Sequence, residues 1–342
     1  MDSRHIQLAH GGGGQLTAEL IEQVILPALG GSVNTQQPRN LRDAAELSLP
    51  SSRVAFTTDT YVVQPLEFPG ADIGKLAICG TVNDLAVSGA RAAALSLALV
   101  LEEGLEIDLL GRVLASASQA ARDAGVTIVT GDTKVVERGG VAGMIINTAG
   151  VGAIYESATL GFSTICEGDC IILSGPLGEH GLAVMAQRKG LSIRAELASD
   201  CAALNGLTEA LLMELGSDVR FMRDPTRGGL AAAVVDVGNS AGVDVELTED
   251  AIPLNRTARA AAEMLGLDLM TIANEGKLVA VVAPQRAERA VEILRGFEIA
   301  RSAAVIGRIG PKSQDPIVEM VTTAGGRRVV QMPYGEELPR IC

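Results

Sequence analysis

The chain has 342 residues, of which 47% are hydrophobic, and its 28 Lys and Arg against 41 Asp and Glu give a net charge of −13. This length can bury a large core and predicts two domains. The negative charge and the 2% aromatic content argue against nucleic acid as a partner, because a polyanion is repelled and bases find few rings to stack on. No apolar run approaches the roughly 20 residues of a membrane span and the N-terminus lacks a signal-peptide pattern, so we expect no membrane association and a cytoplasmic location.

Helix and strand patterns alternate along the chain, which predicts an α/β or α+β architecture. The clearest pair is a helix over Glu106 to Ala124, which ends before Gly125, and a buried strand over Val126 to Thr130. Further strands are expected over Arg53 to Thr57, Gly143 to Val151, Asp169 to Ser174 and Leu278 to Ala283. Further helices are expected over Thr17 to Leu29, Val82 to Ser88, Leu204 to Leu215, Thr226 to Ala241 and Pro284 to Phe297.

The pattern changes near residues 155–168, where a new series of strands and helices begins. We therefore expect an N-terminal domain over residues 1–155 and a C-terminal α/β domain over residues 165–321. Residues 322–342 are rich in Gly and Pro and lack a periodic apolar face, which predicts an arm. Fully extended, the part of this arm from Gly326 to Cys342 spans at most roughly 50 Å.

Three aspartates stand where apolar strands end or tight turns begin: Asp59, Asp84 and Asp132. Carboxylates at such places suit Mg²⁺, which prefers hard oxygen ligands and accompanies nucleotide phosphates. A single aspartate in a turn is also explained as a cap, because its side chain mimics a backbone turn. The three together make a nucleotide and metal site the hypothesis to test.

A run of glycines, Gly11 to Gly14, follows His10. Such a run either presents backbone N–H groups to phosphates or forms a flexible segment, and the sequence leaves both open. The chain has neither a P-loop nor a dinucleotide-binding glycine pattern after a strand.

Two further polar clusters stand out, Arg223-Asp-Pro-Thr-Arg-Gly-Gly229 before an expected helix and Asn274-Glu-Gly-Lys277 before an expected strand. The first suits an anion at a helix start and is equally explained as an ordinary helix entry. His180 is expected to pack or to form hydrogen bonds rather than to act as a base.

The five cysteines are Cys79, Cys166, Cys170, Cys201 and Cys342. Their odd number and the absence of an export signal argue against a disulfide framework, and the Cys166 and Cys170 spacing lacks the second pair that a zinc site needs. Cys342 ends the sequence on a Gly- and Pro-rich arm and is not placed for prenylation. A free thiol there is suited to carry an acyl group, because a thiolate is a strong nucleophile.

Taken together, these stretches resemble the HypE family of hydrogenase maturation factors, carbamoyl dehydratases of the PurM or AIR synthetase-like ATP-binding superfamily. The resemblance runs nearly the whole length in the expected order. The matching segments are Phe56-Thr-Thr-Asp-Thr-Tyr-Val-Val63, Phe68-Pro-Gly-Ala-Asp-Ile-Gly-Lys-Leu-Ala77, Cys79-Gly-Thr-Val-Asn-Asp-Leu-Ala86, Gly131-Asp-Thr-Lys-Val-Val136, Arg223 to Gly229, Asn274 to Lys277 and Pro339-Arg-Ile-Cys342.

This resemblance implies a two-domain PurM-like protomer with a mobile C-terminal tail, which forms a homodimer through its N-terminal domain and binds ATP near the interface. It implies that the carbamoyltransferase HypF loads a carbamoyl group onto Cys342. ATP-dependent dehydration would then convert this S-carbamoyl group to an S-cyanate, a thiocyanate. The implied acceptor is the HypC–HypD complex, which takes cyanide for the iron of a [NiFe]-hydrogenase.

Under this scheme we expect Asp59, Asp84 and Asp132 to hold Mg²⁺, and Lys134 to stabilise charge on the phosphates or on the developing oxyanion. Glu275 is the first candidate for the base, because burial raises the pKa of a carboxyl group; Lys134 can share that role, and the sequence does not decide between them. The residues expected to bind the nucleotide are Asp59, Lys75, Asn83, Asp84, Gly131, Asp132, Asp224 and Asn274.

Two other functions stay open. One keeps the superfamily and changes the acceptor, as in small-molecule kinases, selenophosphate synthetase or purine-ring cyclases, which do not need a terminal cysteine. The other is a maturation scaffold that binds partners without catalysis.

Overall fold

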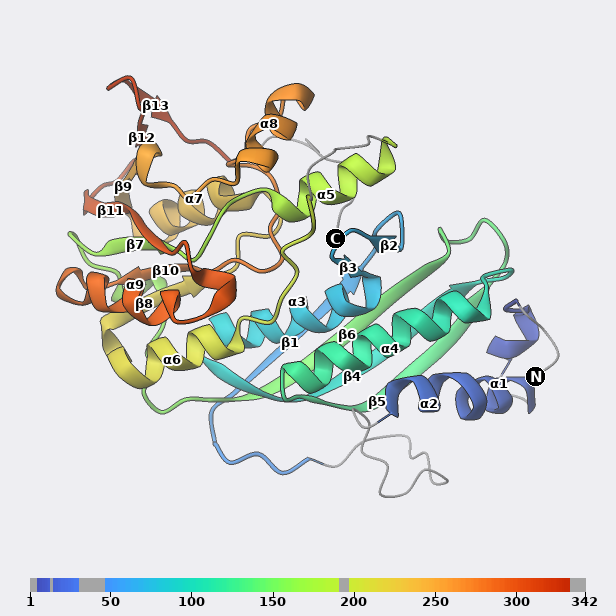
Figure 1. Ribbon diagram of the computed structural model, residues 1–342. Coiled ribbons are helices and arrows are strands. Elements are labelled where there is room, and N and C mark those ends of the chain that lie inside the picture. Colours follow the sequence, from blue (N-terminus) through green and yellow to red (C-terminus); the bar gives the residue numbers. More distant parts are fainter. Residues whose placement is uncertain (1–4, 13–14, 31–46, 191–196, 333–342) are drawn as a thin grey trace.

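The computed structural model describes residues 5–12, 15–30, 47–190 and 197–332, shown as coloured ribbons in Figure 1. Helices and strands alternate, so the expected α/β class is confirmed. Strands from residues 54–154 form one sheet and strands from residues 170–329 form another, and the two sheets occupy different halves of the molecule. None of the helices within these ranges is both long and apolar enough to cross a bilayer.

The N-terminal half contains a sheet with the strand order β1-β6-β4-β5. Strands β4 and β5 pair in parallel, whereas β6 is antiparallel to both β1 and β4. The strands are β1 (Val54–Tyr61), β4 (Ala90–Glu102), β5 (Thr127–Val136), β6 (Met144–Ile154) and the separate pair β2 (Glu67–Phe68) and β3 (Ala71–Asp72). The helices are α1 (Gln15–Leu20), α2 (Leu26–Leu29), α3 (Ile73–Val87) and α4 (Ile107–Asp123), with a π-helical turn over Ile21–Ile25.

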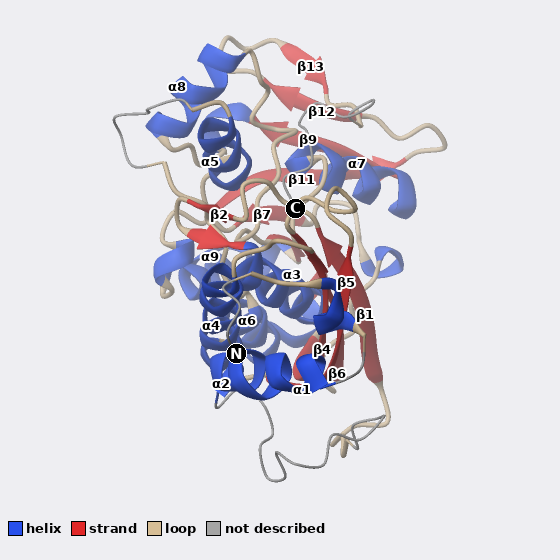
Figure 2. Cartoon of the chain, turned by 90° about the vertical axis from the view of Figure 1, so that its right-hand side faces the viewer, coloured by secondary structure: helices blue, strands red, loops and turns tan. Residues whose placement is uncertain are grey.

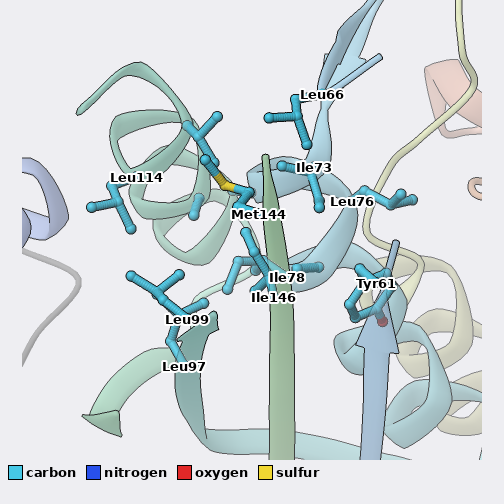
Figure 3. Close-up of a cluster of buried hydrophobic side chains, with 14 of the residues drawn as sticks. Tyr61, Leu66, Ile73, Leu76, Ile78, Leu97, Leu99, Leu114, Met144 and Ile146 are labelled. Atoms are coloured by element: carbon cyan, nitrogen blue, oxygen red, sulfur yellow. The ribbon is translucent and has the colours of Figure 1, made fainter. Parts of the chain in front are cut away.

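Helices α3 and α4 lie on one side of this sheet, as the side view shows (Figure 2). Helix α3 begins at Asp72, whose carboxylate accepts hydrogen bonds from the amides of Gly74 and Lys75 and so satisfies donors that the helix start leaves free. The sheet, α4 and α6 surround α3, which explains why nearly all of its residues are buried. The apolar side chains that meet beneath these helices include Leu97, Leu99, Leu114, Met144 and Ile146 (Figure 3).

The opposite face of the sheet is much more exposed. Along β1, Thr57 and Asp59 point toward α3, whereas Phe56 points away and is 72% exposed. Within the described ranges, β1 pairs only with β6 and β5 only with β4, so the sheet has two open edges. An open-edged sheet with one half-covered face is suited to pair with another chain.

The C-terminal half is built around a larger sheet with the strand order β13-β12-β9-β11-β7-β10-β8. Its strands are β7 (Cys170–Leu173), β8 (Val219–Arg223), β9 (Val243–Thr248), β10 (Val279–Val282), β11 (Ala304–Lys312), β12 (Val318–Val321) and β13 (Arg327–Val329). Its helices are α5 (Glu179–Arg188), α6 (Asn205–Leu215), α7 (Gly229–Ala241), α8 (Arg256–Leu265) and α9 (Ala287–Arg295).

The central strands β7 and β10 are buried on both faces. Ile171 and Leu173 pack toward α7, whereas Ile172 packs toward α6 and α9. This double burial is why β7 and β10 are continuous apolar runs rather than alternating ones.

The expected arm over residues 322–342 begins later than the sequence predicts. Residues 327–329 form β13, which pairs with β12 at the edge of the sheet. A turn precedes it, in which Gly325 has a φ of 82° and the amide of Thr322 donates to the carbonyl of Gly326. A three-residue edge strand has too few side chains to show a period, which explains the error. Residues 333–342, with Cys342, lie outside the described residues.

The side chain of Asn83 ties the two halves together. This residue of α3 is fully buried, and its Nδ2 donates to the carbonyls of Ala202 at 3.1 Å and Glu275 at 3.3 Å. Its Oδ1 accepts from the amide of Leu204 at 2.8 Å. One amide side chain therefore holds two segments of the C-terminal half against α3.

We predict that Asn83→Ala lowers the free energy of unfolding by about 2 to 3 kcal/mol, because the buried amide of Leu204 and the carbonyl of Ala202 lose this partner and the Glu275 carbonyl loses one of its two donors. Urea denaturation would measure the change. Asn205→Ala is the matched control: that side chain also joins the halves, by one half-buried hydrogen bond to the carbonyl of Ala124, and its loss should cost about 1 kcal/mol. Equal losses in the two variants would contradict the special role of Asn83.

Candidate active site

A cavity of about 570 Å³ opens between β1, α3 and the loop that follows β8. Charged and polar side chains from both halves of the molecule surround it. Its lining includes Thr57, Asp59, Tyr61, Asp84, Arg223, Asp224, Arg227 and Glu275. The cavity therefore combines carboxylates with guanidinium groups, a set that suits a phosphate group accompanied by a cation.

Two carboxylates form the wall contributed by the N-terminal half. Asp84 of α3 accepts a hydrogen bond from the Thr57 hydroxyl at 2.8 Å. Burial, only partly opposed by this hydrogen bond, raises the pKa of Asp84, and the charge of Asp59 raises it further. Asp59 also lies 3.4 Å from the Arg227 guanidinium, an ion pair across the two halves.

Asp224 faces these residues from the C-terminal half. It lies between β8 and α7 and is 9% exposed. Burial first, and then the charge of Asp84, raises the pKa of Asp224 to about 7, although Arg223 acts in the opposite direction. A group with this pKa exchanges a proton near neutral pH.

Glu275 is the most deeply buried carboxyl group of the cavity, with 2% exposure. Burial, followed by the charges of Asp224 and Asp200, raises its pKa well above the usual value. Its backbone is held from both sides, since its amide donates to Asp200 Oδ1 at 3.2 Å and its carbonyl accepts from Asn83. Glu275 was predicted from the sequence as the candidate base on the expectation that burial raises its pKa, and the structure shows this burial.

The two arginines of the cavity come from the polar cluster at residues 223–229, although neither was among the predicted site residues. Arg223 forms a 2.5 Å ion pair with Asp236 of α7, and the Arg227 side chain is 78% exposed. Tyr61 was also missed. Its ring is buried and its hydroxyl lies 3.3 Å from Thr81. The arginine-rich cluster was the signal for the arginines, and the matching segment Phe56 to Val63, which contains Tyr61, was the signal for Tyr61.

A second cavity, of about 380 Å³, lies under the N-terminal helices at the β5 edge of the sheet. Gly11 and Gly12 line it together with Gly131, Asp132 and Lys134. Gly131 is required there, because a Cβ atom would lie 2.3 Å from a backbone oxygen. The glycine run thus lies beside the predicted phosphate-binding residues, while Gly13 and Gly14 fall outside the described residues.

The predicted metal ligands do not converge within one chain. Asp59 lies on β1 and Asp132 on β5, the two outer strands, so three strand spacings of roughly 4.8 Å put them about 14 Å apart. The register also places them on opposite faces of the sheet. Asp132 pairs with Ala98, Ala98 pairs with Asn147, and Asn147 pairs with Thr60, so Asp132 and Thr60 lie on the same face. Asp59 precedes Thr60 in the strand and therefore lies on the other face. Among the described residues, no three metal-ligating side chains cluster closely enough to hold an ion.

Three of the residues expected to contact the nucleotide lie outside both cavities. Asn83 and Asn274 are fully buried, and protein backbone groups occupy their side-chain amides. Lys75 lies in the first turn of α3, with its Nζ 3.4 Å from the carbonyl of Gly70. His180 is fully buried, bonds Ser199 at 2.9 Å and packs edge-on against Phe68, so its expected packing role is confirmed.

Comparison with known proteins agrees with the α/β fold and its two halves. Residues 41–154 match the N-terminal domain, and residues 167–318 the C-terminal domain, of AIR synthase related proteins. Carbamoyl dehydratase HypE of Escherichia coli K12 is 43% identical over 99% of both chains, and that of Azotobacter vinelandii is 43% identical over 98% of this chain and 97% of its own. The chain belongs to the HypE family of carbamoyl dehydratases.

Solved HypE structures share the whole architecture. A HypE structure in complex with ATP superimposes with a TM-score of 0.91 at 42% identity, covering 98% of this chain and 99% of that one. A HypE–HypF complex gives 0.79 at 41% identity, covering 82% and 90%. A thiamine monophosphate kinase from Aquifex aeolicus, at 17% identity and a TM-score of 0.61 over 82% and 90%, shares the fold.

The raised pKa of Asp224 makes the stability of this HypE-family protein depend on pH. Because the folded pKa of about 7 exceeds the usual 3.8, the folded state holds an extra proton between these values, and stability falls as the pH rises from about 4 to about 7. Asp224→Asn should remove this loss. The unfolding free energy of the variant minus that of the wild type should therefore increase with pH up to about pH 7.

Urea titrations at several pH values, with EDTA present, would measure this difference. In Asp84→Asn, which lacks the largest repulsive charge on Asp224, the pH dependence should shrink. A constant offset between Asp224→Asn and wild type at all pH values would show that Asp224 titrates normally.

Proposed function

We propose that this protein uses ATP to dehydrate a carbamoyl group on its own Cys342 to an S-cyanate, which supplies the cyanide ligand for the iron of a [NiFe]-hydrogenase. The observation that carries the proposal is the first cavity, where Asp59, Asp84 and Asp224 face two arginines above the buried Glu275. Family membership supports the reaction type, and the ATP complex of a relative supports the nucleotide.

The chemistry follows from a poor leaving group. In a thiocarbamate, S–C(=O)–NH₂, the oxygen does not leave as hydroxide. If the carbonyl oxygen attacks the γ-phosphorus of ATP, ADP departs and the oxygen becomes part of a phosphate ester as one N–H proton is lost. Removal of the second N–H proton then expels phosphate and leaves S–C≡N. ATP thus yields ADP and phosphate, and the carbamoyl group loses the elements of water.

Glu275 is our candidate for the base that takes an N–H proton, because its carboxyl group is buried at the inner end of the cavity with a raised pKa. Lys134 stays the alternative, and its other proposed role is to stabilise charge on the phosphates or the oxyanion. Arg223 and Arg227 are placed to bind phosphate oxygens.

We propose that a homodimer completes the site. Asp59 and Asp84 would hold Mg²⁺ in one chain, and Asp132 of the partner subunit would supply the third carboxylate, since one chain cannot bring the three together. Bound Mg²⁺ would neutralise phosphate charge. The two open sheet edges and the exposed Phe56 face support such pairing.

Partners follow from the same scheme. HypF would load Cys342, as the HypE–HypF complex of a relative supports. The HypC–HypD complex would accept the cyanide group, and we assign these steps to the cytoplasm.

Cys342 should be the residue that carries the group. After co-expression with the loading enzyme, Cys342→Ala should show neither a carbamoyl adduct nor loss of water on addition of ATP, because the proposal places the carrier thiol at Cys342 alone. Intact-protein mass spectrometry would measure both masses, and ATP binding should persist. Cys166→Ala, which removes an exposed thiol, should behave as wild type. A water loss in Cys342→Ala would refute the carrier role.

Two defective proteins should rescue each other if the dimer completes the site. Asp84→Asn and Lys134→Ala homodimers should each be inactive, whereas a mixture that exchanges subunits should recover about a quarter of the wild-type rate, since random pairing leaves one intact site in four. ATP-dependent water loss on carbamoylated protein would report the rate. Mixing Asp84→Asn with itself is the control, and no recovery in the hetero-mixture would place both residues in the same chain's site.

A further inference from the structure

The backbone around Glu275 is held by a buried carboxylate, Asp200. The two carboxylate oxygens of Asp200 accept hydrogen bonds from the amides of Glu275 and Gly276, each at 3.2 Å. The Asp200 side chain is 2% exposed. This geometry fixes the plane of the peptide bond from which the Glu275 side chain departs, because two adjacent N–H groups are bound by one rigid group.

A buried cation completes the arrangement. Lys277 Nζ lies 3.1 Å from Asp200 and 3.1 Å from Glu179, and the Lys277 side chain is 5% exposed. Although burial alone would lower the pKa of Lys277, Asp200 and Glu179 outweigh it and raise that pKa, so Lys277 stays charged. Removing either member of such a buried pair leaves an uncompensated charge.

The backbone beside Asp200 is equally constrained. A Cβ atom on Gly276 would lie 1.8 Å from the carbonyl oxygen of Asp200, so only glycine allows the two segments to approach this closely. The amide of Ala202 donates to the Glu275 carbonyl at 3.3 Å. By contrast, the Glu275 carboxyl group makes no hydrogen bond or ion pair with the residues that the structure describes. Its orientation therefore depends on the backbone that carries it.

We propose that Asp200 and Lys277 are positioning residues for the dehydration: the ion pair holds the Glu275 backbone so that its carboxyl group points into the cavity. The inference rests on the proposed function, and neither Asp200 nor Lys277 is among the residues that line the cavity. None of the previously predicted site residues has this role.

The test is a double-mutant cycle between Asp200 and Glu275. Asp200→Asn keeps the size of the side chain but removes its charge and turns an NH₂ group toward N–H donors. We expect the single-turnover rate of ATP-dependent water loss on the carbamoylated protein to fall roughly 10- to 100-fold at saturating ATP, because small misplacements of a reacting group have effects of this size. The dissociation constant for ATP should stay within about 3-fold of wild type.

In the Glu275→Gln background, Asp200→Asn should have almost no further effect, since a residue that acts through Glu275 loses its influence when Glu275 is gone. Long incubations followed by mass spectrometry would measure the low rates. Lys277→Met should resemble Asp200→Asn, and Lys277→Arg should recover part of the rate because it keeps the cation.

Asp169→Asn is the matched control. Asp169 is 1% exposed, accepts from the amide of Cys166 at 2.8 Å and faces Arg220 at 3.7 Å, but it precedes β7, whereas Lys277 lies at the opposite end of the same sheet. Its substitution should lower the melting temperature as Asp200→Asn does and leave the rate unchanged.

Two results would overturn the proposal: an equal rate loss from Asp200→Asn with and without Glu275, which indicates general destabilisation, or no rate loss in Asp200→Asn. A failure of the proposed function is distinguishable, because wild type and Asp169→Asn would then also show no ATP-dependent water loss.

Discussion

The site depends on one contact between the two halves of the chain, the three hydrogen bonds that Asn83 makes with the segments at residues 200–204 and 274–277. Asp59 and Asp84 belong to one half, and Asp224 and Glu275 to the other. The carboxylates on the two walls of the cavity repel each other, so another contact must hold the two halves at a fixed separation. A buried amide supplies this without adding charge, and its bonds end next to the Glu275 backbone. The same contact therefore joins the two halves and holds the backbone that carries Glu275.

A constraint of another kind comes from strand order. In a sheet ordered β1-β6-β4-β5, residues on the first and last strands stay three strand spacings apart. The chain places Asp59 on the first and Asp132 with Lys134 on the last. No side-chain rotation removes that separation. The open edges and the half-exposed face that carries Phe56 are consistent with two half-sites that become complete when two chains meet.

Sequence reasoning succeeded where a side-chain period or a motif was present. The α4 helix was placed within one residue at each end, since it has an apolar stripe and a glycine stop. The start of β5 was also placed within one residue, but the strand continues six residues beyond the predicted end. Helices α5 and α8 and several strands were missed, namely β2, β3, β4, β8, β9, β11, β12 and β13. Among them, β4 is an Ala- and Leu-rich run that also fits a buried helix. Polar motifs located Asp59, Asp84, Asp224 and Glu275 in one cavity, but they could not separate residues that line a site from residues that support it. Asn83 and Asn274 lie within matching motifs, and the structure shows their buried side-chain amides bonded to backbone groups.

Supporting and lining residues look alike in a sequence because both are polar and buried, and the difference lies in which groups satisfy them. Asn274 has its amide occupied by Gly178, Pro225 and Ile272, whereas the Glu275 carboxyl group next to it faces the cavity. A buried acid without a protein partner is costly, and three more carboxylates nearby increase the cost. The folded state tolerates this cost because hydrogen bonds with Asp200, Ala202 and Asn83 hold the backbone of Glu275 in place. A cationic ligand that bound these carboxyl groups would reduce their mutual repulsion and so lower the free energy of the folded state, which means that ligand affinity and the cost of burying these groups have the same electrostatic origin.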